Sequence, residues 1–266
     1  MLIDIGANLT HESFQSDIDS VLTRAKESKV DQIIVTGTSV LSSIKAQQLT
    51  QKHNSLYSTA GIHPHYAEET SERTIADLEK ILILPEVVAV GETGLDFFRD
   101  YTAKDVQIFS FEKHIELATR FKLPMFLHER DAHQTFYEIL RTSRDKLDKL
   151  VVHCFTGNRE ALFKYLDLDC YIGITGWICD ERRGQDLQKL VAAIPSDRLM
   201  IETDAPYLLP RTLKIKPKNR RCEPMHLNEI CEQIAIRTGK TKDFWALNTT
   251  KNAKVFFSLG AKLDES

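Results

Sequence analysis

The sequence lacks the features that place a protein in or across a membrane. No stretch approaches the ~20 consecutive apolar residues of a membrane span. The first residues, Met1-Leu2-Ile3-Asp4-Ile5, contain no basic segment, no apolar signal stretch and no twin arginine. The five cysteines are odd in number and form no CxxC pair, which argues against a disulfide framework and a zinc ribbon. We therefore expect a soluble, cytoplasmic protein with reduced thiols.

The sequence also lacks a strong charge bias and any low-complexity segment. Its net charge of −3 gives no reason to expect a polyanionic partner, so nucleic-acid binding would need a local basic patch. With 42% hydrophobic residues, the chain can bury a sizeable core. We expect residues 1–266 to form one domain, because barrels of alternating strands and helices reach about 250 residues. The sequence calls for no obligate protein partner, and we expect a monomer.

What the sequence does contain is a series of short apolar runs of the strand type. Several are continuously apolar, as is typical of parallel strands buried on both faces. The eight runs are Leu2–Gly6, Asp31–Gly37, Leu56–His63, Val87–Gly94, Pro124–His128, Leu150–Phe155, Tyr171–Gly176 and Leu199–Asp204.

The segments between these runs have helical periodicity. Ile18, Val21 and Ala25 have the i, i+3, i+7 spacing of an amphipathic helix. After the last run, helices are expected over residues 227–234 and 244–257, and no GxGxxG turn follows the first run. We predict a (β/α)8 TIM barrel, closed by eight parallel strands, with an extra C-terminal helix.

Histidines and carboxylates stand at the ends of five runs, where such barrels build their active sites. Glu92, His128 and His153 end the fourth, fifth and sixth runs, and neighbouring strands ~4.8 Å apart let them converge on one ion. Asp204, at the end of the eighth run, can reach the same centre and is the candidate base. Imidazole and carboxylate without thiolate suit magnesium, manganese, zinc or iron. We expect a divalent cation, magnesium first, with manganese or zinc as alternatives.

Other polar residues near the run ends are candidates for substrate contacts. His63 and His65 share the loop after the third run, and we favour His63 as the catalytic hydrogen-bond donor because it directly ends the run. His65 and Arg130 are expected to bind substrate. The remaining histidines His11, His53, His114 and His226 are expected at the surface or in helix caps.

The segment after the eighth run is strongly basic. Six of the eleven residues from 211 to 221 are Lys or Arg and none is acidic, and a loop there overhangs the barrel mouth. Trp177 can either stack a terminal base or pack as part of a lid. The candidate substrate-binding residues of this region are Trp177, Arg182, Arg183, Arg211, Lys216, Lys218, Arg220 and Arg221. Their position favours phosphate binding over a merely solvated charge run.

Five segments together resemble the TatD family of metal-dependent deoxyribonucleases, within the amidohydrolase superfamily. They are Asp4–Thr10, Gly61–His65, Gly91–Asp96, His153–Gly157 and Glu202–Tyr207. The resemblance runs from the N-terminus to about residue 257. With the segment 179–184 it is closest to TatD proper, the branch that acts as a 3′–5′ exonuclease on DNA and RNA and prefers single strands.

The resemblance implies a TIM barrel that hydrolyses phosphodiester bonds in single-stranded DNA and RNA, with a role in DNA repair. It implies Glu92, His128 and His153 as metal ligands, and Asp204 as the acid that orients or deprotonates water. Most relatives also carry a His-x-His pair at the end of the first strand, where this sequence has Gly6 and Asn8. We therefore expect one well-held ion and a second bound weakly through Asp204, Asn8 and substrate phosphate.

The sequence leaves other functions open. The same ligand set can polarise a carbonyl, so a small-molecule amidohydrolase is an alternative, although the basic mouth speaks against it. A deacylase of aminoacyl-tRNA would use the same basic patch for RNA and attack an ester. The missing His-x-His pair also raises the possibility of a nucleic-acid-binding module without catalytic activity. The retained acidic and imidazole residues make this interpretation weaker.

Overall fold

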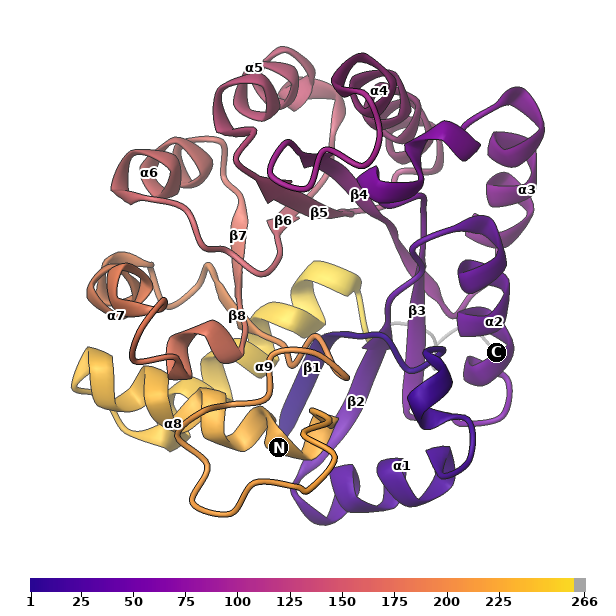
Figure 1. Ribbon diagram of the computed structural model, residues 1–266. Coiled ribbons are helices and arrows are strands. Elements are labelled where there is room, and N and C mark those ends of the chain that lie inside the picture. Colours follow the sequence, from indigo (N-terminus) through magenta and orange to yellow (C-terminus); the bar gives the residue numbers. More distant parts are fainter. Residues whose placement is uncertain (261–266) are drawn as a thin grey trace. The chain divides into compact units, whose positions relative to one another are not determined.

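The computed structural model describes residues 1–260 and contains eight strands in one sheet, in the order β1 to β8. The predicted (β/α)8 TIM barrel with an added C-terminal helix is confirmed (Figure 1). The strands are β1 Leu2–Ala7, β2 Val30–Val35, β3 Leu56–Ala60, β4 Val87–Asp96, β5 Met125–Arg130, β6 Leu150–Val152, β7 Tyr171–Ile174 and β8 Leu199–Ile201. Each lies within or overlaps one of the eight apolar runs.

Helices alternate with the strands. They are α1 Ile18–Glu27, α2 Val40–Thr50, α3 Glu72–Leu82, α4 Lys104–Phe121, α5 His133–Ser143, α6 Arg159–Asp167, α7 Gln185–Leu190, α8 Leu227–Thr238 and α9 Lys242–Phe257. Capping boxes begin α2 at Ser39 and α3 at Ser71, because their hydroxyls accept from otherwise unpaired amides of the first turn. Among residues 1–260, no helix is both long and apolar enough to cross a membrane.

The chain divides into two compact units. The first contains Met1–Ile34, Cys154–Asn158 and the described residues from Ile172 onward, and the second contains Val35–His153 and Arg159–Tyr171. In the second unit the helices α3 to α6 lie on the outer side of strands β4 to β6 (Figure 1). The long strand β4 is buried over all ten residues.

The register between β4 and β5 brings chemically active positions together. Gly94 pairs with His128, and Asp96 with Arg130. A side chain at Gly94 would place its Cβ 2.0 Å from the His128 carbonyl oxygen, and Gly94 has a φ of 142°. Only glycine allows the two strands to approach this closely.

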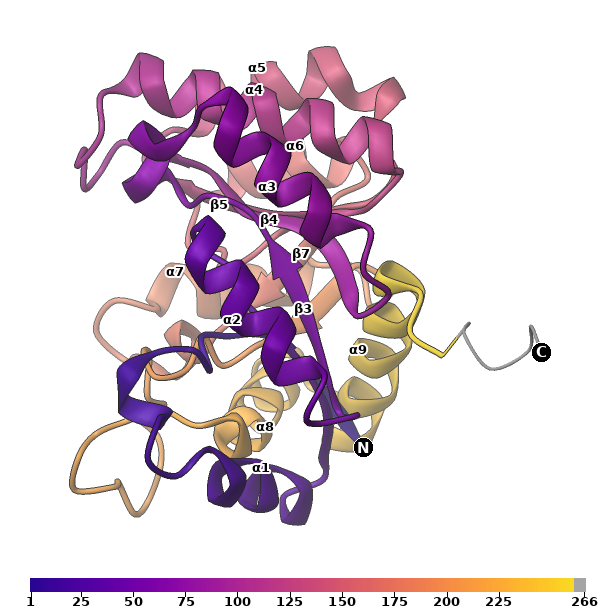
Figure 2. The ribbon, with the colours of Figure 1, turned by 90° about the vertical axis from the view of Figure 1, so that its right-hand side faces the viewer.

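In the first unit the beginning of the sheet meets its end. The Asp204 amide donates to the Gly6 carbonyl (2.8 Å), the Asn8 amide donates to the Ala205 carbonyl (2.7 Å), and Ala7 and Ala205 form a parallel bridge. The helix α9, yellow in Figure 2, runs beside β1 and packs against both β1 and β8. The last strand is thereby joined to the first, as barrel closure requires.

The acid Asp4 is fully buried at this junction. Its carboxylate accepts from the Thr203 amide at 2.9 Å, from the Thr203 hydroxyl at 2.5 Å and from the Gly6 amide at 3.3 Å. Burial raises the pKa of Asp4 to about 8 despite these hydrogen bonds. Asp4 therefore fixes the residue that directly precedes Asp204.

The expectation for His114 is wrong. This histidine is fully buried on α4, where its Nε2 accepts from the Ile62 amide at 2.9 Å and its Nδ1 lies 2.7 Å from the Ser110 carbonyl oxygen. Burial lowers its pKa to about 4, which keeps the ring neutral. A neutral ring can donate at one nitrogen and accept at the other, so His114 supports the chain directly before His63.

Candidate active site

Histidines and carboxylates of the second unit form a compact cluster around one oxygen of Glu92. The Glu92 Oε1 atom lies 3.2 Å from His63 Nε2, 3.0 Å from His128 Nδ1 and 2.8 Å from His153 Nε2. Donor atoms of His63, Glu92 and His128 all lie within 4.8 Å of one another, close enough to hold a metal ion. The strand ends thus bring together the predicted residues of β4, β5 and the end of β6.

A second carboxylate, Asp96, completes the cluster at the end of β4. Its Oδ2 atom lies 2.8 Å from His65 Nε2 and 3.3 Å from His128 Nε2. Sequence reasoning missed Asp96 as a site residue. The signal was present, because Glu92 and Asp96 are four residues apart, and even spacing along a strand directs side chains to the same face.

The electrostatics of the cluster favour neutral His63 beside ionised acids. Burial lowers the pKa of His63 to about 4. Burial opposes ionisation of Glu92, but His153, His63 and His128 hold the pKa of its carboxyl well below the ordinary value. Burial would also raise the pKa of Asp96, yet hydrogen bonds from His128 and His65 lower it. The carboxylates therefore stay charged at neutral pH, as metal ligands must.

The donor set fits a divalent cation. Imidazole nitrogens and a carboxylate oxygen that lie close together, with His63 and Glu92 buried and His128 partly exposed, are ligands for zinc, manganese or magnesium sites. His63, predicted as a hydrogen-bond donor, belongs to the group whose spacing fits a metal. His153 contacts the same Glu92 oxygen and stays a predicted ligand.

Asp204 lies in the first unit, directly after β8. It has a φ of 53°, and its Oδ1 atom accepts from the Asn8 side-chain amide at 2.9 Å. Asn8, which stands at a position of the expected His-x-His pair, therefore orients the candidate base. That Asp204 acts as the base together with the Glu92 cluster stays a prediction.

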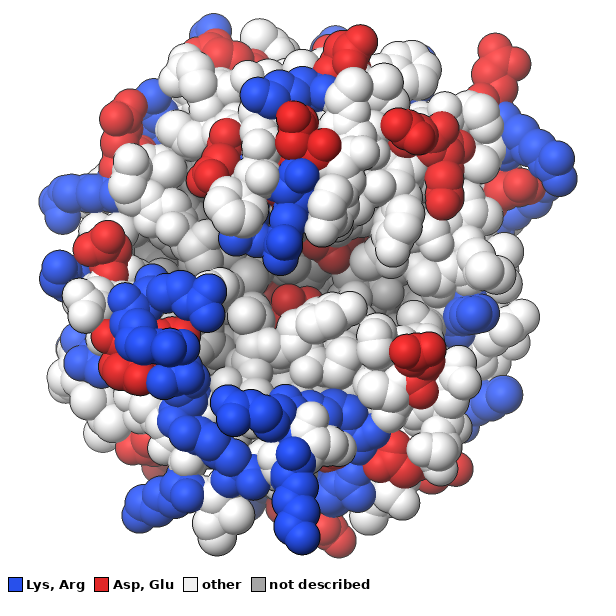
Figure 3. Space-filling view, viewed as in Figure 1, with Lys and Arg blue, Asp and Glu red and all other residues white. Residues whose placement is uncertain are grey.

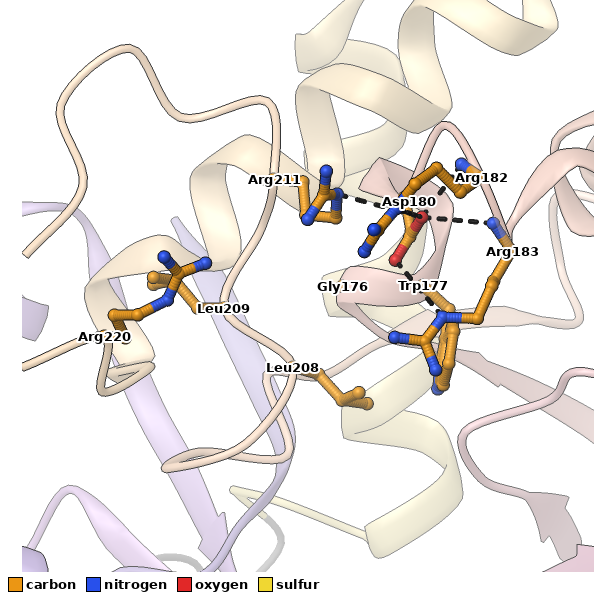
Figure 4. Close-up of a pocket in the computed structure, with 9 residues that line it drawn as sticks. All are labelled: Gly176, Trp177, Asp180, Arg182, Arg183, Leu208, Leu209, Arg211 and Arg220. Carbon is orange, nitrogen blue, oxygen red and sulfur yellow. Dashed lines mark hydrogen bonds and ion pairs between the residues drawn. The ribbon is translucent and has the colours of Figure 1, made fainter.

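Most of the predicted phosphate-binding residues line one pocket of about 370 Å³ in the first unit (Figure 4). Asp180 accepts from the amides of Arg182 and Arg183, and the guanidiniums of Arg182, Arg183 and Arg211 lie 3.8 to 3.9 Å from its carboxylate. Figure 4 shows Arg220 on the facing loop. Four arginines and one aspartate line the pocket, so positive charge remains for an anion.

The pocket also has an aromatic wall. The Arg183 guanidinium lies 5.3 Å from the centre of the Trp177 ring, and Trp177 is partly exposed. Arg211 is additionally held by both carboxylate oxygens of Glu181, at 2.9 and 2.6 Å. These contacts direct Arg183 toward the Trp177 ring and Arg211 toward Glu181.

The rest of the basic segment divides into two kinds of residue. Lys216 and Lys218 are exposed, and Lys and Arg side chains gather over this loop in Figure 3. Arg221 is instead only 11% exposed and pairs with Asp17 and Glu223, each at 2.7 Å. The structure therefore places Arg221 in an ion-pair network that anchors the loop.

A protein-family model described as TatD related DNase matches residues 3–258 of this chain. The chain belongs to the TatD family. A protein of Erwinia amylovora named 3′-5′ ssDNA/RNA exonuclease TatD is 46% identical over 259 residues, covering 97% of this chain and 100% of the relative. A protein of Shigella flexneri with the same name is 43% identical over 258 residues, covering 97% of this chain and 99% of the relative.

Solved structures of TatD-family proteins have the same fold. YJJV, a TatD homologue from Escherichia coli, superposes with a TM-score of 0.90 at 26% identity, covering 97% of this chain and 98% of the other. A TatD-family hydrolase from Entamoeba histolytica superposes with a TM-score of 0.88 at 27% identity, covering 96% of this chain and 97% of the other. The family resemblance and the fold inferred from sequence are thus confirmed.

Proposed function

We propose that this TatD-family chain is a metal-dependent 3′–5′ exonuclease that hydrolyses phosphodiester bonds in single-stranded DNA and RNA. The observation that carries the proposal is the Glu92 oxygen surrounded by imidazole nitrogens of His63, His128 and His153. The names of relatives at 43–46% identity over the whole chain support the substrate and the polarity. The family match across residues 3–258 supports one hydrolase domain over the full chain.

We assign Glu92, His128 and His153 as ligands of a divalent cation. When bound, the cation neutralises charge on the phosphoryl oxygens and lowers the pKa of water. Magnesium is the proposed ion, and manganese or zinc would fit the two or more imidazoles at least as tightly.

The remaining chemistry belongs to side chains of the protein. Asp204, held by Asn8, accepts a proton from the attacking water. The water oxygen forms a bond to phosphorus, the bond from phosphorus to the leaving oxygen breaks, and that oxygen takes a proton from solvent. His63 donates a hydrogen bond to the phosphoryl oxygens in its neutral form, which its lowered pKa favours.

The arginine pocket would bind the backbone of the substrate. Arg182, Arg183, Arg211 and Arg220 offer planar donor groups that match phosphate oxygens. Trp177 supplies a face for a base. Lys216 and Lys218 add charge at the exposed loop, while His65 and Arg130 contact substrate near the metal cluster.

We further propose a monomeric, cytoplasmic enzyme that acts in DNA repair without an obligate protein partner. The cellular compartment is supported by the cysteines, all five of which are thiols.

The test is cleavage of end-labelled single-stranded and double-stranded DNA and RNA by metal-stripped protein, with magnesium or manganese added back. Stepwise release of mononucleotides from the 3′ end of single strands is the expected result. Release of an amino acid from aminoacyl-tRNA with intact oligonucleotides would instead identify a deacylase. Hydrolysis of small amides or esters alone would identify an amidohydrolase, and binding without any cleavage would identify a nucleic-acid-binding module.

A further inference from the structure

The loop between β4 and α4 exposes two aromatic side chains. Phe98 is 53% exposed and Tyr101 is 65% exposed, although aromatic side chains gain much from burial. Both rings belong to the short segment that follows the cluster residue Asp96 and precedes α4.

Asp96, which belongs to the Glu92 cluster, also holds the backbone of this loop. The Asp96 Oδ1 atom accepts from the amides of Phe98 at 3.1 Å and Arg99 at 2.8 Å. At the other end, the Thr102 hydroxyl donates to the His65 carbonyl at 3.3 Å. The exposed rings therefore project from a fixed backbone, which lowers the entropy lost on binding.

The same loop touches the metal cluster directly. The second oxygen of Asp96 lies 2.8 Å from His65 and 3.3 Å from His128. The Tyr101 ring lies 4.8 Å from the His65 ring, in edge contact. The Tyr101 ring is therefore within reach of a nucleotide whose phosphate lies at the cluster.

Arg130 adds a cation to the aromatic surface. Its guanidinium lies 3.9 Å from the centre of the Phe98 ring. Arginine that stacks on a ring keeps its N–H donors free at the edge, where they can bind phosphate. An aromatic face next to such donors matches an unpaired base with its own phosphate.

We propose that Phe98, Tyr101 and Arg130 form a stacking platform for an unpaired base of the substrate, next to the metal cluster. The proposal rests on the proposed nuclease function and extends it to residues that set strand preference. A base within a duplex is already stacked on both faces, whereas a single strand offers its bases to the platform. The platform thus favours single strands without reading their sequence.

The test compares a ten-residue oligothymidylate with an abasic strand of the same length. Binding is measured by fluorescence anisotropy, and cleavage by release of labelled product. In the wild-type protein the strand with bases should bind more tightly. Phe98→Ala and Tyr101→Ala should each reduce that preference roughly 10- to 100-fold. Phe98→Trp should retain it, because a stacking face is restored.

Phe163 provides a matched control within the same unit. It lies on α6, is 38% exposed, and carries the Arg159 guanidinium 4.8 Å from its ring centre. Phe163→Ala removes the same kind of exposed ring and arginine contact away from the cluster residues. It should leave the preference for bases and the cleavage rate at wild-type values.

The outcomes separate the platform from the proposed function. Wild-type protein that binds both strands equally, or a preference that survives Phe98→Ala and Tyr101→Ala, overturns the platform. Wild-type protein that prefers bases but cleaves neither strand supports the platform and overturns the nuclease function. An equal loss in Phe163→Ala would show a general surface effect and would also overturn the platform.

Discussion

The buried acid Asp4 should make the stability of the protein depend on pH. Its folded-state pKa of about 8 lies far above the ordinary aspartate pKa of 3.8, because burial disfavours the charged form. The folded protein therefore holds this proton between those two pH values, whereas the unfolded chain releases it. The contribution to stability is fully present below pH 3.8 and is lost as the pH rises through about 8.

The size of the effect follows from the shift. At about 1.36 kcal/mol per pKa unit, the move from 3.8 to about 8 corresponds to a loss of up to about 6 kcal/mol. This is large compared with the ~5–15 kcal/mol stability of a typical protein. The slope is about 1.4 kcal/mol for each pH unit inside the window.

The substitution Asp4→Asn should remove this slope. Its amide stays neutral, and its oxygen can accept from Thr203 and Gly6 while its amino group donates to the Thr203 hydroxyl. Urea unfolding at pH 5, 6, 7 and 8 without metal should show the variant gaining on wild type by about 1.4 kcal/mol per pH unit, with equal m values.

The comparison has its own control. Asp4→Ala leaves the Thr203 and Gly6 donors without their acceptor, so it should lie below Asp4→Asn by a similar amount at every pH. Stability curves of wild type and Asp4→Asn that run parallel from pH 5 to 8 would refute a neutral, buried Asp4. Histidines titrate in both proteins and cancel from the difference.

Three further predictions concern the site and its basic loop. Glu92→Ala should lose both bound metal and activity, with partial rescue at high metal concentration, whereas Asp204→Asn should keep the metal while turnover falls roughly 10²–10⁴-fold. Calorimetric titration of manganese and single-turnover cleavage check both variants. The opposite pattern would make Asp204 the primary ligand and Glu92 the base. Alanine at three exposed basic positions should weaken oligonucleotide binding more than turnover and flatten its salt dependence, and an unchanged slope would mean a solvated surface. These positions are Lys216, Lys218 and Arg220. Arg221→Ala should instead cost about 1–3 kcal/mol in urea unfolding, because Arg24 alone then pairs with Asp17 and Glu223, and unchanged stability would contradict an anchoring role.

Much of the fold was predictable because buried parallel strands are continuous apolar runs, a local property of the sequence. The ends of the strands were less predictable than their existence. The fourth run was expected to end at Gly94, but β4 continues to Asp96, where hydrogen bonding with β5 persists. That two-residue extension is why Asp96 was missed although Glu92 was found. In the third run the strand ends at Ala60, and His63 follows in a loop.

Side chains whose role depends on distant partners could not be assigned from sequence. Arg221 looks like its basic neighbours along the chain, yet Asp17, which pairs with it, lies 204 positions away. His114 has the polar environment of an ordinary helix position in sequence, and only the packing of α4 shows that it is buried. The strand-end residues Glu92, His128 and His153 were predictable because parallel strands place their ends together.

The union of the first strand with the end of the last has a consequence for synthesis on the ribosome. The Gly6 carbonyl receives its hydrogen bond from the Asp204 amide, so this pairing cannot form until residue 204 has been translated. At roughly 5–20 residues per second, the N-terminal segment waits on the order of 10–40 s for its partner. During that interval the apolar side chains of Ile3 and Ile5, buried in the finished protein, lack the cover that α9 later provides. The first unit is therefore completed after the second, although it contains Met1–Ile34, and a nascent chain stalled before residue 204 would lack the partner of this strand.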